Sequence, residues 1–310
     1  MGAMDSTFIK QFEELVGAEN VLRDEPLSAH TTVRVGGPVE CYVVPHSIDQ
    51  VVQAVALCRA AGVPFHIVGH GSNVLVCDEG LFGVAIQVSG NVGAVEVHDD
   101  GAIVAEAGAS NATVAAEACR AGLTGFEFAA GIPGTIGGAA IMNAGAYDGE
   151  FKNVATSVRC LDPAGAIVDI DHEQADWGYR RSMMEECGYI ILSATLKLEP
   201  GDPVAIKARM DELARRRSDK QPLDLPSAGS TFKRPPGHFA GKLIQDAGLM
   251  GYGVGGAQVS TKHAGFVVNV GGATASDVMQ VIEDVRSRVF EQSGVMLEPE
   301  VRLWGFEQGN

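Results

Sequence analysis

GHGSNVLV at residues 69–76 and GIPGTIGGAAIMNAGAY at residues 131–147 are the two stretches that decide the fold. Their glycines remove side chains, so consecutive backbone N–H groups can converge on an anion. Further hydrogen bonds are available from Ser72, Asn73, Thr135 and Asn143. Either loop alone is compatible with an ordinary tight turn. Two such loops in one chain favour a site for a dinucleotide diphosphate.

The commoner nucleotide-binding motifs do not explain these glycines. No GxGxxG lies between a strand and a helix with an acidic residue about 20 positions later, as a Rossmann site requires. No GxxxxGK[ST] loop occurs in the sequence either. The chain therefore predicts a dinucleotide site of another kind.

Hydrophobic periodicity predicts strands and helices in an irregular α+β order, not a regular βαβ array. Strands are expected at 41–44, 64–68, 74–77, 158–161, 167–170, 189–198, 257–260 and 265–270, with short β segments between 81 and 107. Helices are expected at 47–61, 110–121, 204–217, 239–247 and 276–292, and residues 122–146 are expected to form one long loop. The EPGDP segment at 199–203 marks a domain boundary.

Charge, hydropathy and cysteine spacing exclude several classes of protein. A net charge of −16 over 310 residues argues against nucleic-acid binding. No apolar run of about 18 residues and no secretory signal pattern occurs, so we expect a cytoplasmic protein without a membrane segment. The six cysteines form no CxxC pair and no zinc-type cluster, which predicts reduced thiols and no required metal.

One basic stretch interrupts this acidic composition. Seven of the 23 basic residues lie between positions 215 and 242: Arg215, Arg216, Arg217, Lys220, Lys233, Arg234 and Lys242. A basic helix end followed by a solvated loop would explain them. A pocket that attracts phosphates into an otherwise repelling protein would explain them equally well.

The two glycine loops resemble the FAD-diphosphate loops of the vanillyl-alcohol-oxidase (PCMH) type of flavin fold. Other segments resemble one family in particular, UDP-N-acetylenolpyruvoylglucosamine reductase. The matching segments are TTVRVGGP (31–38), YRRS (179–182), QPLDLPSAGSTFKRP (221–235), AGKLIQDAGLMG (240–251), GAQVSTKHAGFVVN (256–269) and LEPEVRLWG (297–305). Only about 50 residues separate Tyr179 from Ser230, which resembles the short subtype without the extra substrate-capping loop.

The resemblance implies an FAD enzyme of peptidoglycan synthesis that uses NADPH as co-substrate. NADPH would reduce non-covalently bound FAD, and the enolpyruvyl ether of a UDP-sugar would then receive the hydride at its vinyl carbon. Residues 1–20 would form an N-terminal helix with a short tag. Residues 21–200 would form an FAD-binding domain with subdomains 21–80 and 81–200, and residues 201–310 a substrate-binding domain. The chain would be a monomer or a weak dimer.

Three catalytic residues are implied by the matching motifs. Arg180 would stabilise the enolate at the substrate carboxylate, because a guanidinium matches both carboxylate oxygens. Ser230 would donate a proton to the α-carbon, and Glu300 would orient or share a proton with that carboxylate. From the residues alone, a surface ion pair is the favoured interpretation of Arg180 and a turn residue that of Ser230, and Glu300 could be an ordinary strand-edge carboxylate. Their places in the matching motifs favour the catalytic roles instead. The neighbours Arg181 and Glu298 are the residues most easily mistaken for Arg180 and Glu300.

The resemblance also implies the binding residues. FAD would contact Arg34, Gly69, His70, Gly71, Ser72, Asn73, Val74, Leu75, Gly131, Ile132, Pro133, Gly134, Thr135, Gly137, Gly138, Asn143, Gly145 and Ala146. The substrate would contact Tyr179, Lys233 and Arg234. Two other functions stay open: an oxidase of alcohols or sugars on the same flavin fold, and a non-catalytic nucleotide-binding module.

Overall fold

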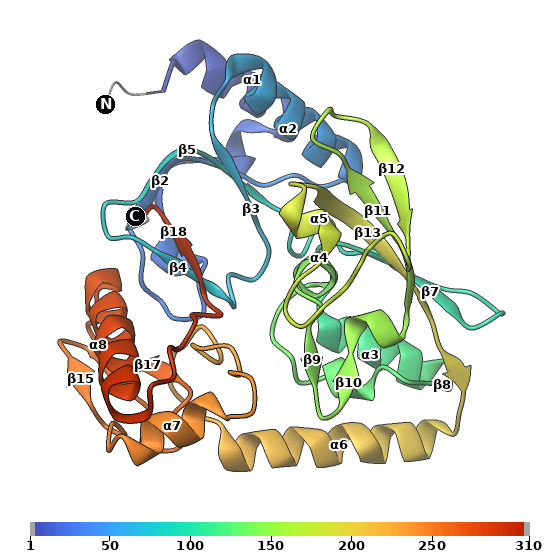
Figure 1. The fold of residues 1–310 in the computed structure, drawn as a ribbon. Coiled ribbons are helices and arrows are strands. Elements are labelled where there is room, and N and C mark those ends of the chain that lie inside the picture. The colour runs from blue at the N-terminus through green and yellow to red at the C-terminus, as the bar shows by residue number, and fades with distance from the viewer. Residues whose placement is uncertain (1–3, 307–310) are drawn as a thin grey trace. The chain divides into compact units, whose positions relative to one another are not determined.

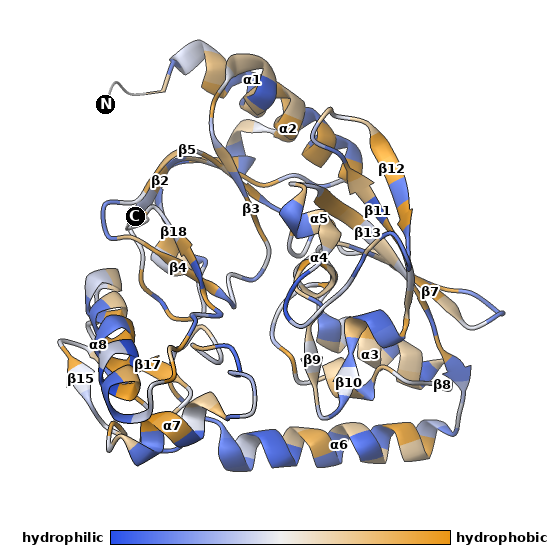
Figure 2. Cartoon of the chain, viewed as in Figure 1, coloured by the Kyte–Doolittle hydropathy of each residue, from blue (hydrophilic) through white to orange (hydrophobic). Residues whose placement is uncertain are grey.

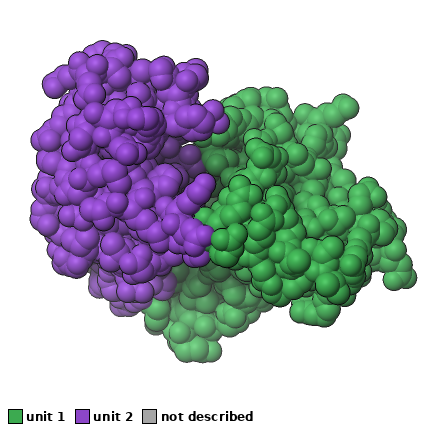
Figure 3. All heavy atoms as spheres, turned by 90° about the horizontal axis from the view of Figure 1, so that it is seen from below, with its two compact units in different colours: residues 1–22, 41–70, 83–217 green, residues 23–40, 71–82, 218–310 purple. Residues whose placement is uncertain are grey.

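The computed structural model describes residues 4–306 and divides them into two compact units (Figure 3). Unit 1 comprises residues 1–22, 41–70 and 83–217, and unit 2 comprises residues 23–40, 71–82 and 218–310. Most of the expected N-terminal tag, residues 1–3, and the last four residues of the expected second domain lie outside the described part of the chain. Each unit is built from three separate segments of sequence.

Figure 1 labels the helices and strands. The helices are α1 (Ser6–Val16), α2 (Ile48–Ala61), α3 (Asn111–Arg120), α4 (Ile136–Ile141), α5 (Met183–Glu186), α6 (Pro203–Lys220), α7 (Ala240–Asp246) and α8 (Ala275–Ser293). The strands up to the second glycine loop are β1 (Val21–Pro26), β2 (Pro38–Val43), β3 (Phe65–Val68), β4 (Val74–Val76), β5 (Leu81–Gln87), β6 (Val95–Val97), β7 (Ala102–Glu106) and β8 (Leu123–Thr124). The later strands are β9 (Gly145–Ala146), β10 (Gly149–Glu150), β11 (Ala155–Leu161), β12 (Ile167–Asp171), β13 (Ile190–Lys197), β14 (Glu199–Pro200), β15 (Gly253–Val254), β16 (Ala257–Val259), β17 (Val267–Asn269) and β18 (Arg302–Trp304).

Unit 1 contains an antiparallel five-stranded sheet in the order β12-β11-β13-β7-β6. Helix α4 packs on β13 and β7, and its buried Ile136 and Ala140 belong to the core of this sheet. A separate core joins α1 and α2 to β5, with Phe12, Val55 and Ile86 fully buried. Strands β3 and β5 pair in parallel within a sheet of order β1-β2-β5-β3.

The core of unit 2 forms around α8. The buried residues of this helix recur at helical spacing: Ala275, Val278, Val281, Ile282, Val285 and Val289. Hydrophobic and hydrophilic residues alternate along α8 in Figure 2. The same core contains Val33, Val35 and Leu75, which come from the two early segments of the unit. The early segments are therefore part of the packing around the C-terminal helix.

The expected loop at 122–146 is the largest difference from the sequence-based expectation. It contains β8, the helix α4 and the strand β9. Helix α4 is Gly- and Ala-rich, and glycine weakens the intrinsic preference for helix. Tertiary packing on the sheet, together with the Thr135 cap on the Gly138 N–H, offsets this weakness.

Candidate functional site

The second glycine loop is anchored to unit 1 by backbone hydrogen bonds. Ile136 N–H donates to the Ala109 carbonyl at 2.8 Å, and Gly137 N–H donates to the Ala107 carbonyl at 2.9 Å. Among residues 4–306, the N–H groups of Gly134 and Thr135 have no acceptor. Backbone N–H groups in this state are suited to an anion, which fits a diphosphate at this loop.

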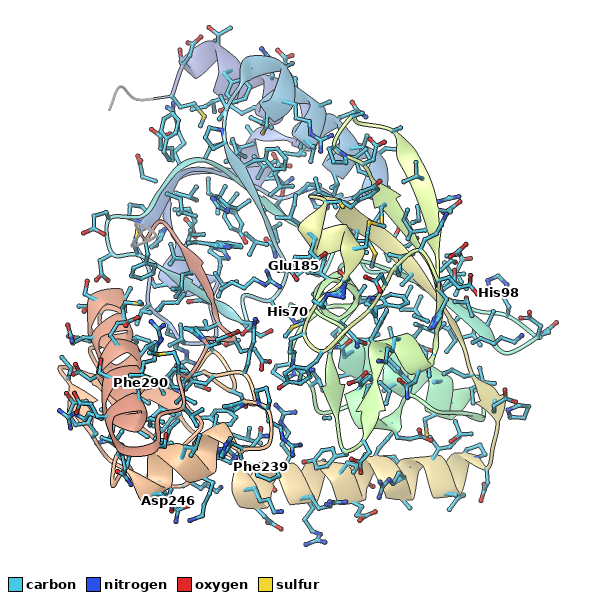
Figure 4. All side chains as sticks on the ribbon, viewed as in Figure 1. His70, His98, Glu185, Phe239, Asp246 and Phe290 are labelled. Atoms are coloured by element: carbon cyan, nitrogen blue, oxygen red, sulfur yellow. The ribbon has the colours of Figure 1, made fainter. Side chains whose placement is uncertain are left out.

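The first glycine loop begins beside this second loop. A methyl group built on Gly69 would lie 2.9 Å from Thr135 Oγ1, so the close approach requires glycine. The next residue, His70, is labelled in Figure 4, and burial lowers the pKa of its imidazole. Burial therefore favours the uncharged form of this imidazole.

Asn143 connects the second loop to the segment that carries Arg180. Its side chain is 1% exposed and its φ is 44°. The Asn143 amide donates to the Gly178 carbonyl at 3.0 Å and to Glu150 Oε2 at 3.1 Å, and it accepts from Lys152 N–H at 3.0 Å. These bonds give Asn143 a structural role, and its contact with a cofactor stays a prediction.

Arg180 lies against the same loop. Its Nη1 donates to the Asn143 carbonyl at 3.3 Å, and its Nη2 donates to the Gly145 carbonyl at 3.2 Å. Its guanidinium carbon lies 5.1 Å from the ring centroid of Tyr179. Arg181, by contrast, pairs with Asp176 and, at 3.0 Å, with Glu186. Arg181 therefore forms ion pairs of the kind that the sequence left open for Arg180.

In unit 2 the first glycine loop meets the segment of Glu300. Asn73 Nδ2 donates to the Glu300 carbonyl at 3.1 Å, and Arg302 N–H donates to the Asn73 carbonyl at 3.0 Å. Strand β18 then continues beside β4 in a parallel pair, with Arg302 opposite Val74. The side chain of Asn73 is thus a direct link between two parts of the expected site.

Ser230 lies in the same neighbourhood of unit 2. The next residue, Thr231, accepts from the Glu300 N–H at 2.8 Å, and its own N–H donates to the Gly265 carbonyl at 2.9 Å. A methyl group on Gly229 would lie 3.9 Å from the Ser72 carbonyl oxygen. Unit 2 therefore brings together Ser230, the Glu300 backbone and the first glycine loop, which are far apart in the sequence.

The predicted substrate residues of unit 2 have partners of their own. Lys233 Nζ lies 3.5 Å from Glu298 Oε2. The guanidinium carbon of Arg234 lies 4.0 Å from the ring centroid of Phe239, and its Nε donates to the His238 carbonyl at 3.2 Å. Phe239 is nevertheless 61% exposed, so this pair presents an aromatic and cationic surface to solvent.

Arg34 is the one predicted cofactor residue in the first segment of unit 2, residues 23–40. Its φ is 59°, in the left-handed region, and its side chain is exposed. Left-handed backbone in a non-glycine residue is costly and is commonly found at functional sites. Contact of Arg34 with FAD stays a prediction.

Several residues that lie near the predicted site residues were not themselves predicted to act there. Glu150 and Lys152 bond to the Asn143 side chain. Arg217, named above only as part of the basic stretch, lies beside Gly131. Asp78 of unit 2 bonds to the first N–H groups of α8. Tyr147 and Asp148 both have positive φ, at 52° and 68°, in the turn between β9 and β10. A two-residue turn of this kind normally carries Asn, Asp or Gly at both positions, and here Tyr147 occupies the first position while the Asp-Gly pair begins at the second.

Two negative findings apply to the described residues. Within residues 4–306, no group of three or more His, Cys, Asp or Glu side chains could hold a metal ion. No helix in the same part of the chain is long and apolar enough to cross a membrane.

Comparison with known proteins agrees with this geometry. A family described as "FAD binding domain" matches residues 39–171. A solved structure of alkyldihydroxyacetonephosphate synthase is 16% identical, with a TM-score of 0.51 over 64% of this chain and 41% of that one, and it shows the fold alone. The chain is an FAD-dependent oxidoreductase with the vanillyl-alcohol-oxidase (PCMH) type of α+β fold.

The particular family is also shown. A family described as "UDP-N-acetylenolpyruvoylglucosamine reductase, C-terminal domain" matches residues 221–304. The reductase of that name from Clostridium botulinum strain Hall is 48% identical over 97% of both chains. The solved reductase from Thermus caldophilus is 35% identical, with a TM-score of 0.77 over 92% of this chain and 98% of that one. This chain belongs to the UDP-N-acetylenolpyruvoylglucosamine reductase family, which confirms the resemblance and the FAD cofactor expected from the sequence.

Proposed function

We propose that this chain reduces UDP-N-acetylglucosamine enolpyruvate to UDP-N-acetylmuramate with NADPH, in the cytoplasmic stage of peptidoglycan synthesis. The observation that carries the proposal is the 48% identity over 97% of both chains to a reductase of this name. FAD, when bound, would take a hydride from NADPH and deliver it to the vinyl carbon of the substrate. The FAD-binding region would be residues 21–200 and the substrate-binding region residues 201–310.

Arg180 would stabilise the negative charge that develops at the substrate carboxylate. An enol ether is electron-rich and accepts hydride only if its carboxylate can take up the charge. A guanidinium offers several donors in one plane, which matches the two carboxylate oxygens. The bonds to the Asn143 and Gly145 carbonyls fix this group before the substrate arrives, so little reorganisation is needed.

Ser230 would supply the proton that completes the product. Its side chain is exposed, and its backbone neighbours tie it to Gly265 and to Glu300. A hydroxyl is a weak acid, but the α-carbon of an enolate is strongly basic and can take its proton. Glu300 would hold the substrate carboxylate in register for this transfer. One NADPH and one proton are consumed for each substrate reduced.

The absorbance spectrum of the purified protein under anaerobic conditions tests this function. We expect a yellow protein whose flavin band near 450 nm is bleached by about one equivalent of NADPH and restored by the enolpyruvyl substrate. A colourless protein that does not take up FAD would instead support the nucleotide-binding module. Rapid peroxide formation with a small alcohol would support the oxidase.

The role of Ser230 is tested by Ser230→Ala. We expect bleaching by NADPH to keep its wild-type rate, because the serine acts only on the second substrate. Restoration of the flavin band by that substrate should slow by about 10²- to 10⁴-fold, as loss of a general acid usually does. Ser227→Ala, in the same segment, is the control and should stay near wild type. Restoration within tenfold of the wild-type rate would exclude proton donation by Ser230.

A further inference from the structure

Arg217, near the end of α6, lies against the second glycine loop of unit 1. A methyl group built on Gly131 would lie 3.4 Å from Arg217 Cδ and 3.9 Å from its Nη1. The side chain is half-buried, unlike most of the charged residues of this helix. Gly131 thus leaves backbone, with no side chain of its own, directly in front of a cation.

The charge of Arg217 is not neutralised by its surroundings. Within residues 4–306, its guanidinium forms no hydrogen bond and no ion pair. The acidic residues of α6 pair with other cations: Glu212 pairs with Arg209 at 2.7 Å and with Arg216 at 3.7 Å, and Asp211 pairs with Lys207. Burial lowers the pKa of Arg217, and the Tyr147 phenol only partly opposes this effect. A desolvated charge without a counter-charge is costly, and a bound anion would offset that cost.

The residues beside Arg217 form a strained hairpin tip, Tyr147 and Asp148, which carries one carboxylate and lies beside a second arginine of α6. Tyr147 and Asp148 hold φ values of 52° and 68°, which cost non-glycine residues about 1 kcal/mol each. The guanidinium carbon of Arg216 lies 5.0 Å from the Tyr147 ring centroid. At the base of this hairpin, Gly145 accepts the hydrogen bond from Arg180. Arg180 therefore lies at the base of the hairpin and Arg216 at its tip, while the hairpin itself carries the carboxylates of Asp148 and Glu150.

We propose that Arg217 binds a phosphate group of a bound nucleotide in front of Gly131. This inference rests on the proposed function, which supplies three nucleotides with phosphates: FAD, NADPH and the UDP-sugar. A planar guanidinium binds phosphate oxygens in pairs, and bare backbone at Gly131 lets such a group approach. The N–H groups of Gly134 and Thr135, a few residues along the loop, add donors of the same kind.

Calorimetric titration of three variants tests the inference without measuring turnover. Arg217→Gln removes the charge, and Arg217→Lys keeps the charge but loses the planar fork. Arg209→Gln is the matched control, because it removes the same charge from an exposed position of the same helix. FAD is titrated into the apoprotein, and NADPH and UDP-N-acetylglucosamine are titrated into the flavin-loaded protein. The control should change every dissociation constant by less than about twofold.

We expect Arg217→Gln to weaken one of the three nucleotides by about 10- to 150-fold, the usual effect of losing a charge-assisted hydrogen bond. The affected nucleotide identifies the source of the phosphate, and Arg217→Lys should recover part of the affinity. Changes below threefold for all three nucleotides would overturn the proposal. If Arg217→Gln does not fold, a wild-type affinity of Arg217→Lys for all three would overturn it as well. The wild-type titrations report separately on the proposed function, because a wild-type protein that binds none of the three would refute that function itself.

Discussion

Arg180, the residue proposed to stabilise the substrate carboxylate, shows how a single side chain is held at the second glycine loop. Its φ of 54° lies in the left-handed region, and its guanidinium is held by two carbonyls of the second glycine loop. Arg181, the next residue, instead carries two exposed carboxylate partners. The adjacent arginines therefore form a matched pair for an experiment, since one bonds to the loop and the other pairs with the carboxylates of Asp176 and Glu186.

Arg180→Lys should slow restoration of the flavin band by the enolpyruvyl substrate by about 10²- to 10³-fold. Lysine keeps the charge but has three donors in place of five and no planar fork, so it cannot bond two carbonyls and both carboxylate oxygens at once. Arg181→Lys, the control, should remain within about twofold, because exposed ion pairs contribute little. Anaerobic stopped-flow absorbance measures both variants. Equal slowing in the two variants would contradict the assignment of Arg180, because it would show that its bonds to the loop give it no special part in the reaction.

At the residue scale, the sequence predicted which side chains to inspect but not their surroundings. Motifs located Arg180, Ser230 and Glu300, and the structure links each of their segments to a glycine loop. Arg217 was visible only as one member of a basic stretch. Arg217 differs from the other basic residues because its guanidinium is partly buried beside Gly131 and has no acidic partner within residues 4–306. This environment depends on contacts between residues 86 positions apart.

Helix α8 shows how an element is held by the segment that follows the first glycine loop and β4. Asp78, two residues after β4, accepts from the Ala275 N–H at 2.7 Å and from the Ser276 N–H at 2.8 Å. Its Oδ2 also accepts from the Ser276 hydroxyl at 2.6 Å. These N–H groups begin α8 and have no partner within the helix. A carboxylate at this position also interacts favourably with the positive end of the helix dipole.

Asp78→Asn should lower the free energy of unfolding by about 1 to 2 kcal/mol, the usual cost of losing a helix cap. The amide nitrogen would face an N–H group, because both carboxylate oxygens of Asp78 accept. Glu79→Gln, which removes the same charge one residue later, should change the stability by less than about 0.5 kcal/mol. Urea unfolding followed by circular dichroism measures both variants. An unchanged stability of Asp78→Asn would contradict the capping role.

The same cap predicts a dependence on pH. Partial burial raises the pKa of Asp78, but hydrogen bonds from Ser276 and Ala275 outweigh it and hold the pKa below its usual value. A lowered pKa in the folded state gives stability that is complete above the ordinary aspartate pKa of about 3.9 and is lost as the pH falls through the folded value. The stability difference between wild type and Asp78→Asn should therefore be constant near pH 7 and shrink in acid. A difference that grew on acidification would contradict this assignment.

At the element scale, predictability followed the strength of the local pattern. Helix α8 was expected at 276–292 and is Ala275–Ser293, because its apolar residues repeat at helical spacing and Gly294 ends it in the left-handed conformation. Helix α4 was missed, because Ile136–Ile141 is short, rich in glycine and stabilised by packing on β13 and β7. The parallel pairing of β18 with β4 was not predictable either, since it joins residues more than 200 positions apart.

At the scale of the whole molecule, the chain passes repeatedly between its two units. Unit 2 consists of residues 23–40, 71–82 and 218–310, so its C-terminal segment folds against two segments made much earlier. The early segments supply Val33, Val35 and Leu75 to the core, β4 as the partner of β18, and Asp78 as the cap of α8. The boundary expected near residue 200 separates a region predicted to bind FAD from a region predicted to bind the substrate. This division stays a prediction.

A fragment of residues 201–310 should not fold by itself. Burial of one large apolar side chain contributes about 1.5 to 3 kcal/mol. Loss of Val33, Val35 and Leu75 therefore removes about 5 to 9 kcal/mol, which is comparable to the 5 to 15 kcal/mol that stabilises a whole domain. Thermal unfolding followed by near-ultraviolet circular dichroism should show a cooperative transition for the full chain and none for the fragment. Addition of the fragment 1–200 should restore part of the signal, because it supplies the missing strand, cap and core residues. A sharp transition in the isolated fragment would mean that α7, α8 and strands β15 to β17 are sufficient for a stable core, and that the early segments are bound to this core without being required for it.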